Sequence, residues 1–203
     1  MKHKEAQTQA PINSYIRKRW SPRAFLAEAP PLDNLFTMLE AARWAPSCFN
    51  EQPWRFILGV KSRGDSYHKI FDSLVGFNQD WARHAPVLLL AVARTHFSTN
   101  DKPNDHHAYD TGAAMSLLSV QAAEFDIYVH QMAGFDRDKA RENFAIPEGF
   151  LPVAAAAIGY LGEPQILNEK QRPGEAKTRE RKGWGETCFE GTWGTPLERG
   201  DRG

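Results

Sequence analysis

The feature that most constrains the fold of this sequence is a long helical pattern over residues 109–125, dense in Ala, Leu and Met. It is apolar on nearly every side, and a helix of that kind is buried in a core or at an interface between subunits. We therefore expect it at the centre of the molecule. With 203 residues, 41% of them hydrophobic, the chain is long enough to bury such a helix within one domain.

Strand-like and helical patterns alternate along the rest of the chain. Short apolar runs predict strands at residues 54–60, 87–93, 127–132 and 153–160, and the second of these reads as a strand buried on both faces. Helical spacing follows Leu32 and Asp33, where Asp33 can cap, and continues until Pro46 ends it. Further helical spacing covers residues 67–74 and 136–144. The class is therefore mixed α and β.

Composition limits the partners and the compartment. Lys plus Arg and Asp plus Glu both number 25, so no overall field attracts nucleic acid or an anionic membrane. The two cysteines, Cys48 and Cys188, form no Cys-x-x-Cys pair, which fits a reducing setting. Neither a signal peptide nor an apolar run of membrane-spanning length is found, so we expect a soluble cytoplasmic protein. Residues 168–203 are polar and Gly-rich, and we expect an extended C-terminal arm there.

Two clusters of cations could bind phosphate. Near the N-terminus, Arg17, Lys18, Arg19 and Arg23 lie close to the hydroxyl of Ser21, and guanidinium and hydroxyl groups bind phosphate through charge-assisted hydrogen bonds. Residues 177–179, Lys-Thr-Arg, form a second cluster of the right size. Each cluster taken alone could also be an ordinary solvated surface, a basic turn in the first case and a charged tail in the second.

Two turns could bind a planar heterocycle. The turn over residues 45–54 joins a helix to a strand, and the amides of Asn50 and Gln52 could match the donors and acceptors of a flavin or pyrimidine edge. The same residues could equally serve to shape the loop. At the end of another strand, Met132, Ala133 and Gly134 form a turn whose backbone N–H groups can donate to a ligand.

Together these segments, from about Ser14 to about Arg179, resemble the nitroreductase family in order and spacing. The family's Arg-x-Ser-x-Arg/Lys-x-Phe is matched from Arg19 to Phe25, and its Pro-Ser-x-x-Asn-x-Gln-Pro-Trp from Pro46 to Trp54. The resemblance implies an α+β, nitroreductase-like fold with a central mixed β-sheet flanked by helices. It also implies a single FMN-binding domain over residues 1–203, in an intertwined homodimer with FMN at the interface.

The resemblance further assigns the cofactor-binding residues. The FMN phosphate would meet Arg19, Ser21 and Arg23 with Lys177 and Arg179, and the turn at Ser47 to Asn50 would come from the other subunit. Asn78 would bond the isoalloxazine edge, and the backbone N–H of Ala133 and Gly134 would face flavin N5, so no side chain acts as acid or base. The full set is Arg19, Trp20, Ser21, Arg23, Pro46, Ser47, Cys48, Asn50, Gln52, Asn78, Met132, Ala133, Gly134, Lys177 and Arg179.

The implied activity is a ping-pong hydride transfer from NADH or NADPH, through flavin N5, to an organic acceptor such as a nitroaromatic or a quinone. Cys48, Phe49 and Trp81 depart from the family pattern, and we expect each to reshape or neutralise the acceptor pocket. The sequence fixes neither the acceptor nor the choice of NADH or NADPH. Flavin-based dehalogenation, dehydrogenation or flavin breakdown remain alternatives, as does a protein that binds or sequesters FMN without turnover.

Other chemistries have weaker signals. Cys48 has no His partner in a recognisable arrangement, so a buried structural cysteine is the better interpretation. His106 and His107 are adjacent in a loop and lack metal-ligand spacing, so we expect no metal site. No Gly-x-Gly-x-x-Gly loop occurs, so the nicotinamide would bind transiently over the flavin. The aromatic tail over residues 182–197 is predicted to pack across the partner subunit.

Overall fold

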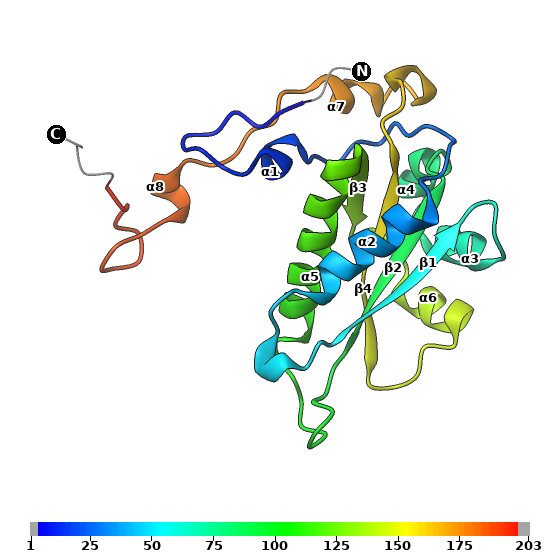
Figure 1. Cartoon of the computed structure of the whole chain (residues 1–203), viewed down its shortest axis with the longest axis horizontal. Coiled ribbons are helices and arrows are strands. Elements are labelled where there is room, and N and C mark those ends of the chain that lie inside the picture. Colours follow the sequence, from blue (N-terminus) through cyan, green and yellow to red (C-terminus); the bar gives the residue numbers. More distant parts are fainter. Residues whose placement is uncertain (1–3, 199–203) are drawn as a thin grey trace.

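The computed structural model describes residues 4–198, and its centre is a four-stranded sheet (Figure 1). The strands β1 (Trp54–Val60), β2 (Val87–Arg94), β3 (Ile127–Met132) and β4 (Phe150–Tyr160) lie in the order β1-β2-β4-β3. We expected a mixed sheet, but all three ladders between these strands are antiparallel. β2 and β3 do run in the same direction; β4 lies between them, so they form no parallel ladder.

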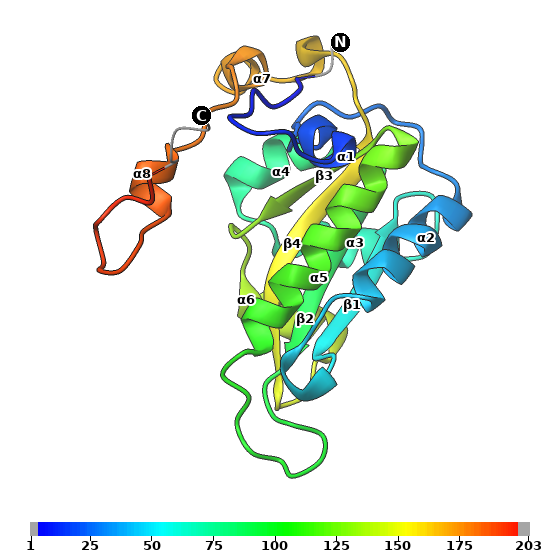
Figure 2. The same ribbon diagram turned by 60° about the vertical axis from the view of Figure 1, so that its left-hand side comes forward.

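Helices cover both faces of the sheet (Figures 1 and 2). On one face lie α2 (Leu32–Arg43) and α5 (His107–Ala122); on the other lie α3 (Ser66–Ser73), α4 (Gly76–Ala82) and α6 (Arg137–Phe144). β2 supplies Leu88 and Leu90 to one hydrophobic cluster and Leu89 and Ala91 to the other. The prediction of a strand buried on both faces is therefore confirmed.

The apolar helix α5 is central on one side only. Met115 and Leu118 are buried against α2 and the sheet. On the opposite side Tyr109 is 77% exposed and Leu117 is 39% exposed. The helix ends at Ala122, and a short 3-10 turn, η2 (Ala123–Phe125), completes the predicted range.

Two local predictions were wrong. β4 begins at Phe150, three residues before the expected start, because Pro152 is accommodated where the register between β2 and β4 shifts. Proline has no N–H to donate and is tolerated at such irregularities. Asp33 does not cap α2: Pro31 holds the N-cap position, and Asp33 lies in the first turn, where its charge still complements the helix dipole.

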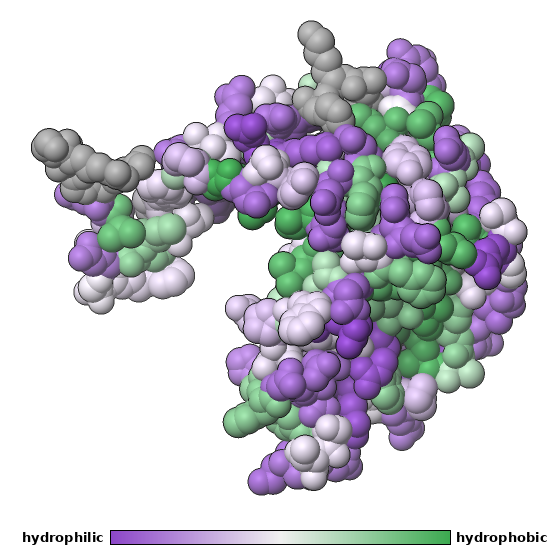
Figure 3. Space-filling model, in the orientation of Figure 1, coloured by the Kyte–Doolittle hydropathy of each residue, from purple (hydrophilic) through white to green (hydrophobic). Residues whose placement is uncertain are grey.

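The remaining short elements lie at the two ends of the chain and in loops. They are α1 (Ser14–Lys18), η1 (Cys48–Asn50), η3 (Pro164–Ile166), α7 (Arg172–Ala176) and α8 (Trp184–Thr187). The segments around α1 and α7 run alongside each other on top of the sheet (Figures 1 and 2). Beyond them α8 and the tail extend away from the body, leaving a hollow between tail and body (Figure 3).

Candidate functional site

The first candidate site is a pocket of about 360 Å³ where the N-terminal segment meets the segment after α7. Residues of the N-terminal segment form one side, and residues 174–181 form the other. The pocket brings together every residue that the resemblance assigns to the phosphate, but not Arg17 and Lys18 of the N-terminal cluster. It has six cationic side chains: Lys4, Arg19, Arg23, Lys177, Arg179 and Arg181. Trp20 and Ser21 also line it, and the acidic members are Glu175 and Glu180. In a chain with no net charge, the pocket is therefore a local concentration of positive charge.

The cations of the pocket act on one another. Burial, and then the neighbouring Arg181, lower the pKa of the Arg19 guanidinium. Burial likewise lowers the pKa of Arg179, with further contributions from Arg19 and Arg181. Both groups remain charged at neutral pH, because guanidinium pKa values lie far above it. The three guanidiniums are therefore held together against their mutual repulsion, and a bound dianion would relieve that repulsion.

The loop that carries Ser21 and Arg23 is fixed from the C-terminal side. Glu175, on α7, is 2% exposed, and its Oε1 accepts a hydrogen bond of 2.7 Å from the backbone N–H of Arg23. Burial raises the pKa of this carboxyl group. Next to it, a Cβ at Gly174 would come within 3.1 Å of Arg23 Nη1, so a glycine lets the guanidinium approach closely. The two sides of the pocket thus form one unit.

Further hydrogen bonds tie the chain ends together. Lys4 Nζ donates to the carbonyl of Lys177 at 2.9 Å. Arg179 Nη1 donates to the carbonyls of Lys4 at 2.8 Å and Arg17 at 2.9 Å. Arg179 therefore has a structural task in addition to its place in the pocket, and only the rest of its guanidinium remains for an anion.

Two buried donors at the pocket have no acceptor within the described part of the chain. They are the indole Nε1 of Trp20 and the Nε of Arg23. A buried donor without a partner costs on the order of 1–3 kcal/mol, so an external acceptor at this place would stabilise the protein. A phosphate offers several acceptor oxygens.

A second group of predicted residues lies where α4 meets the end of β3. Asn78 Nδ2 donates to the carbonyl of Gly134 at 2.9 Å, and a Cβ at Gly134 would stand 2.7 Å from that nitrogen. Ala133 is exposed and Gly134 is half-buried, so the turn is open to a ligand. Asn78 was predicted to bond a flavin edge; the amide already holds Gly134, and its second N–H remains for such a contact.

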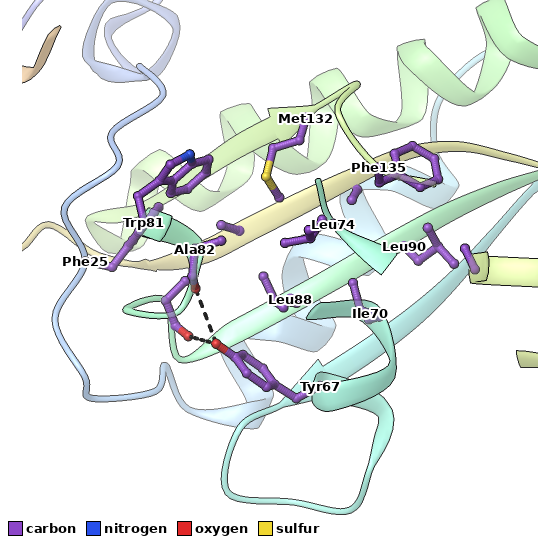
Figure 4. Packing of buried hydrophobic residues seen from close by; sticks show 14 of the residues in the cluster. Phe25, Tyr67, Ile70, Leu74, Trp81, Ala82, Leu88, Leu90, Met132 and Phe135 are labelled. Atoms are coloured by element: carbon purple, nitrogen blue, oxygen red, sulfur yellow. Dashed lines mark hydrogen bonds between the residues drawn. The ribbon is translucent and has the colours of Figure 1, made fainter. Parts of the chain in front are cut away.

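Two residues of this region are less accessible than expected. Trp81 is completely buried in the core that Figure 4 shows, so its side chain cannot reshape an acceptor pocket. The expectation that Trp81 reshapes that pocket is therefore wrong, whereas the expectation that it neutralises the pocket, by standing where a basic residue is common, stays a prediction. Met132 is 4% exposed, and its side chain also packs in this core, which leaves only its backbone near the turn.

The third group is the turn after α2, and its backbone is strained. Phe49, Asn50 and Gln52 all have positive φ, at 52°, 56° and 52°, and side chains disfavour that region. Internal hydrogen bonds hold the turn: Ser47 Oγ accepts from the N–H of Gln52 at 3.0 Å, and Gln52 Nε2 donates to the carbonyl of Asn50 at 3.0 Å. Pro46 and Phe49 are exposed at its surface.

The same turn is also fastened to two other segments. Asp110 of α5 is 3% exposed, and its Oδ2 accepts from the N–H of Cys48 at 3.0 Å. Glu51 accepts from both the N–H and the hydroxyl of Ser98, in the loop after β2. Strained backbone that its surroundings fix in this way is typical of binding sites.

Within one chain the strained turn and the cation pocket lie at opposite ends of α5. Asp110, in the first turn of α5, holds the turn. At the other end, Lys18 of α1 forms an ion pair of 2.7 Å with Asp126, just after η2. The helix has 16 residues, and at about 1.5 Å per residue it separates the two regions by roughly 24 Å. A single chain therefore does not assemble the complete predicted set.

The other residues considered from the sequence lie outside these groups. His107 Nδ1 lies 2.7 Å from the carbonyl of Asn104 in the loop before α5. In residues 4–198 no three His, Cys, Asp or Glu side chains are grouped so that they could hold a metal ion. Cys48 and Cys188 are free thiols. No helix of the described range has the length and apolarity needed to cross a bilayer.

Sequence reasoning missed four residues that shape the candidate site: Lys4, Asp110, Glu175 and Arg181. Asp110 had a visible signal, because it is an acid within an otherwise apolar helix. The other three show their contacts only in the fold; Glu175 and Arg23, for example, are 152 positions apart.

Comparison with known proteins identifies the family to which this chain is similar. The model of the nitroreductase family matches residues 16–65 and 59–160. An uncharacterized 15.4 kDa protein in the ask 5'region of Mycolicibacterium smegmatis is 30% identical over 149 residues, covering 70% of this chain and 99% of that protein. The iodotyrosine deiodinase of Thermotoga neapolitana is 48% identical over 126 residues, covering 52% of this chain and 65% of the deiodinase.

Solved structures agree with these matches. A crystal structure described as an oxidoreductase containing FMN superposes with a TM-score of 0.89 at 35% identity, over 96% of this chain and 99% of that one. A nitroreductase family protein from Clostridium novyi NT gives a TM-score of 0.64 at 24% identity, over 76% and 87% of the two chains, and shows the same fold. The expectation of an α+β, nitroreductase-like fold is confirmed.

Proposed function

This chain belongs to the nitroreductase family, and from that premise we propose that it is a cytoplasmic, homodimeric FMN-dependent oxidoreductase built as one domain. The observation that carries the proposal is the cation pocket, which unites the N-terminal and C-terminal phosphate-binding clusters. The relative with the TM-score of 0.89 is described as containing FMN. Two free cysteines fit a reducing compartment.

The residues of the pocket fit a phosphate dianion. Arg19, Arg23 and Lys177 would bind its charge, and Ser21 would donate its hydroxyl. The unpaired Nε1 of Trp20 and Nε of Arg23 would gain acceptors. Binding would also relieve the repulsion among the guanidiniums. All of these effects favour a phosphate ester over a neutral ligand.

A second copy of the chain would complete the site. A two-fold axis perpendicular to α5 exchanges the ends of that helix, so the partner's strained turn would lie beside this chain's cation pocket. The exposed side of α5, with Tyr109 and Leu117, is the surface that such a partner would cover. Ser47 and Asn50 would then reach the cofactor of the other subunit, and the tail after Arg181 would lie across the partner.

Bound FMN would supply the redox chemistry, which we propose is a ping-pong hydride transfer at flavin N5 from NADH or NADPH to an organic acceptor such as a nitroaromatic or a quinone. The chain's own part is to bind and orient. The open turn at Ala133 and Gly134 would donate backbone N–H groups toward the ring, and Asn78 would hold that turn while offering its second N–H. No side chain is assigned the role of acid or base.

The visible spectrum of the purified protein tests the proposal, before and after anaerobic addition of NADPH or NADH. We expect flavin absorption that bleaches on addition, with the released cofactor matching FMN by mass. A protein that binds FMN but bleaches only slowly would instead be a flavin-sequestering protein. A colourless protein that takes up no FMN would refute the proposal.

A further inference from the structure

A line of contacts, outside the residues assigned to the cofactor, joins the phosphate-binding loop to the turn at Gly134. It begins at Pro22, between Ser21 and Arg23. The carbonyl of Pro22 lies 2.7 Å from Nδ1 of His130, 108 positions away on β3. A carbonyl oxygen only accepts, so Nδ1 carries the hydrogen. Burial lowers the pKa of His130 to about 4, which keeps the ring neutral.

The next contact is between two aromatic rings. The centroids of His130 and Trp81 are 4.5 Å apart, with an interplanar angle of 39°. Trp81 is also stacked with Phe25, with ring centroids 6.4 Å apart and an interplanar angle of 24°. Figure 4 shows Trp81 beside Phe25 at one end of the core. Phe25 follows Arg23 by two residues, so the indole also supports the loop from behind.

The line ends at the turn after β3. Trp81 Nε1 donates to Asn78 Oδ1 at 3.3 Å, and Asn78 Nδ2 donates to the carbonyl of Gly134 at 2.9 Å. Asn78 and Gly134 are packed closely, since a Cβ on Gly134 would lie 2.7 Å from Asn78 Nδ2. Each step of the line is thus a hydrogen bond or a ring contact between buried or half-buried groups.

We propose that His130 and Trp81 are positioning residues that form a buried strut between the loop Ser21 to Arg23 and the turn at Ala133 and Gly134. The inference rests on the function proposed above. Neither residue lines the cation pocket. The strut sets the spacing between the groups that would hold the phosphate and those that would face the ring of the same ligand.

A strut has a physical purpose here because both of its ends are loops. A ligand with a charged end and a planar end is bound well only if its two sets of partners are held at the matching distance, and displacements near 1 Å are costly. Aromatic rings have few rotatable bonds, so a stack of them transmits a displacement instead of absorbing it. We expected Trp81 to alter an acceptor pocket; in this proposal its indole instead supports the two loops that would hold the ligand.

The first test compares His130→Leu with His130→Asn in fluorescence titrations of the apoprotein with FMN. Leucine leaves the Pro22 carbonyl unpaired and frees the loop, and we expect FMN to bind about tenfold more weakly. The Nδ2 of asparagine can reach the place of the imidazole Nδ1, so His130→Asn should recover part of that loss. Tyr67→Phe is the control in the same core: it removes the hydroxyl that donates to the carbonyls of Ala82 and Ala85 (Figure 4), and it leaves the contacts that His130 and Asn78 make along the strut in place.

The second test separates a strut from a merely stabilising core. Trp81→Phe keeps the ring but removes the hydrogen bond to Asn78, and it should change the visible spectrum of bound FMN. His130 and Asn78 both contact Trp81, so a strut should couple them. The FMN dissociation constant of the double variant His130→Leu with Asn78→Ala should differ by about threefold or more from the value expected if the two single effects multiplied. If the His130→Leu variant does not fold, the spectrum of FMN bound to Trp81→Phe and the FMN dissociation constant of His130→Asn still test the strut.

The outcomes distinguish the strut from the function on which it rests. Wild-type protein that binds no FMN would overturn the proposed function. Wild-type protein that binds FMN, together with variants whose effects simply multiply and whose spectra stay unchanged, would overturn the strut alone. A loss in Tyr67→Phe as large as that in His130→Leu would do the same.

Discussion

Replacing Arg19 by alanine should weaken FMN binding while leaving the apoprotein at least as stable as the wild type. In the apoprotein burial, and then the charge of Arg181, lower the pKa of Arg19; burial, and then the charges of Arg19 and Arg181, lower the pKa of Arg179. Removing one charge relieves that repulsion. The backbone bond from the N–H of Arg19 to the carbonyl of Tyr15, which closes α1, does not depend on the side chain.

The loss in affinity follows from the type of contact. A hydrogen bond to a charged group contributes about 1.5–3 kcal/mol, which corresponds to a rise of roughly 10- to 150-fold in the dissociation constant of FMN. Riboflavin has no phosphate, so its binding should not change. Raising the salt concentration should weaken FMN binding to the wild type more than to the variant.

The assay is fluorescence titration of the apoprotein, with its thermal midpoint measured in parallel. Arg17→Ala is the matched control, because it removes the same charge two positions earlier from a side chain that pairs with Glu5 at 2.9 Å, outside the pocket. If Arg19→Ala bound FMN as the control does, or lost riboflavin equally, Arg19 would have no place in a phosphate site.

Three further predictions concern the rest of the molecule. Gly134→Ala should destabilise the protein by about 1–3 kcal/mol in urea unfolding, because the new Cβ would lie 2.7 Å from Asn78 Nδ2; an unchanged midpoint would contradict this close approach. His130 has a pKa of about 4 when folded and 6.5 as a free group, so the unfolded chain takes up the proton first. The free energy of unfolding should therefore fall between pH 6.5 and 4, by at most about 3 kcal/mol, and His130→Asn should flatten this part of the profile. Truncation after Arg181 should weaken the homodimer, and light scattering that finds the dimer intact would show that the tail does not bridge the subunits.

Local patterns predicted much of the fold. The bounds of β1 and β3 agree with the expected ranges, since each is a short apolar run between turn residues. The strand β4 was cut short because Pro152 reads as a breaker, whereas the sheet tolerates it at a register shift. Whether the ladders are parallel or antiparallel depends on which strands become neighbours, and no local sequence pattern contains that information.

Site residues that belong to a family motif or a charge cluster could be predicted from the sequence. Site residues whose contacts form only in the folded chain could not. Four cations of the pocket, Arg19, Arg23, Lys177 and Arg179, were found by their chemistry and by resemblance, whereas Lys4 and Arg181 were not. Trp81 was misplaced because α4 has seven residues, too few for periodicity to show which side is buried. His130 and Glu175 act on residues more than 100 positions away, and their own neighbourhoods in the sequence give no sign of it.

The cation pocket also bears on how the protein is made. Its two sides are residues 4–23 and residues 174–181, so the pocket does not exist until translation has passed Arg181. The sheet and both of its helical layers, by contrast, are complete once β4 has been synthesised at Tyr160. The elements of the core can therefore form before the pocket does, and on the proposed function FMN would bind late, between two segments that already contact each other.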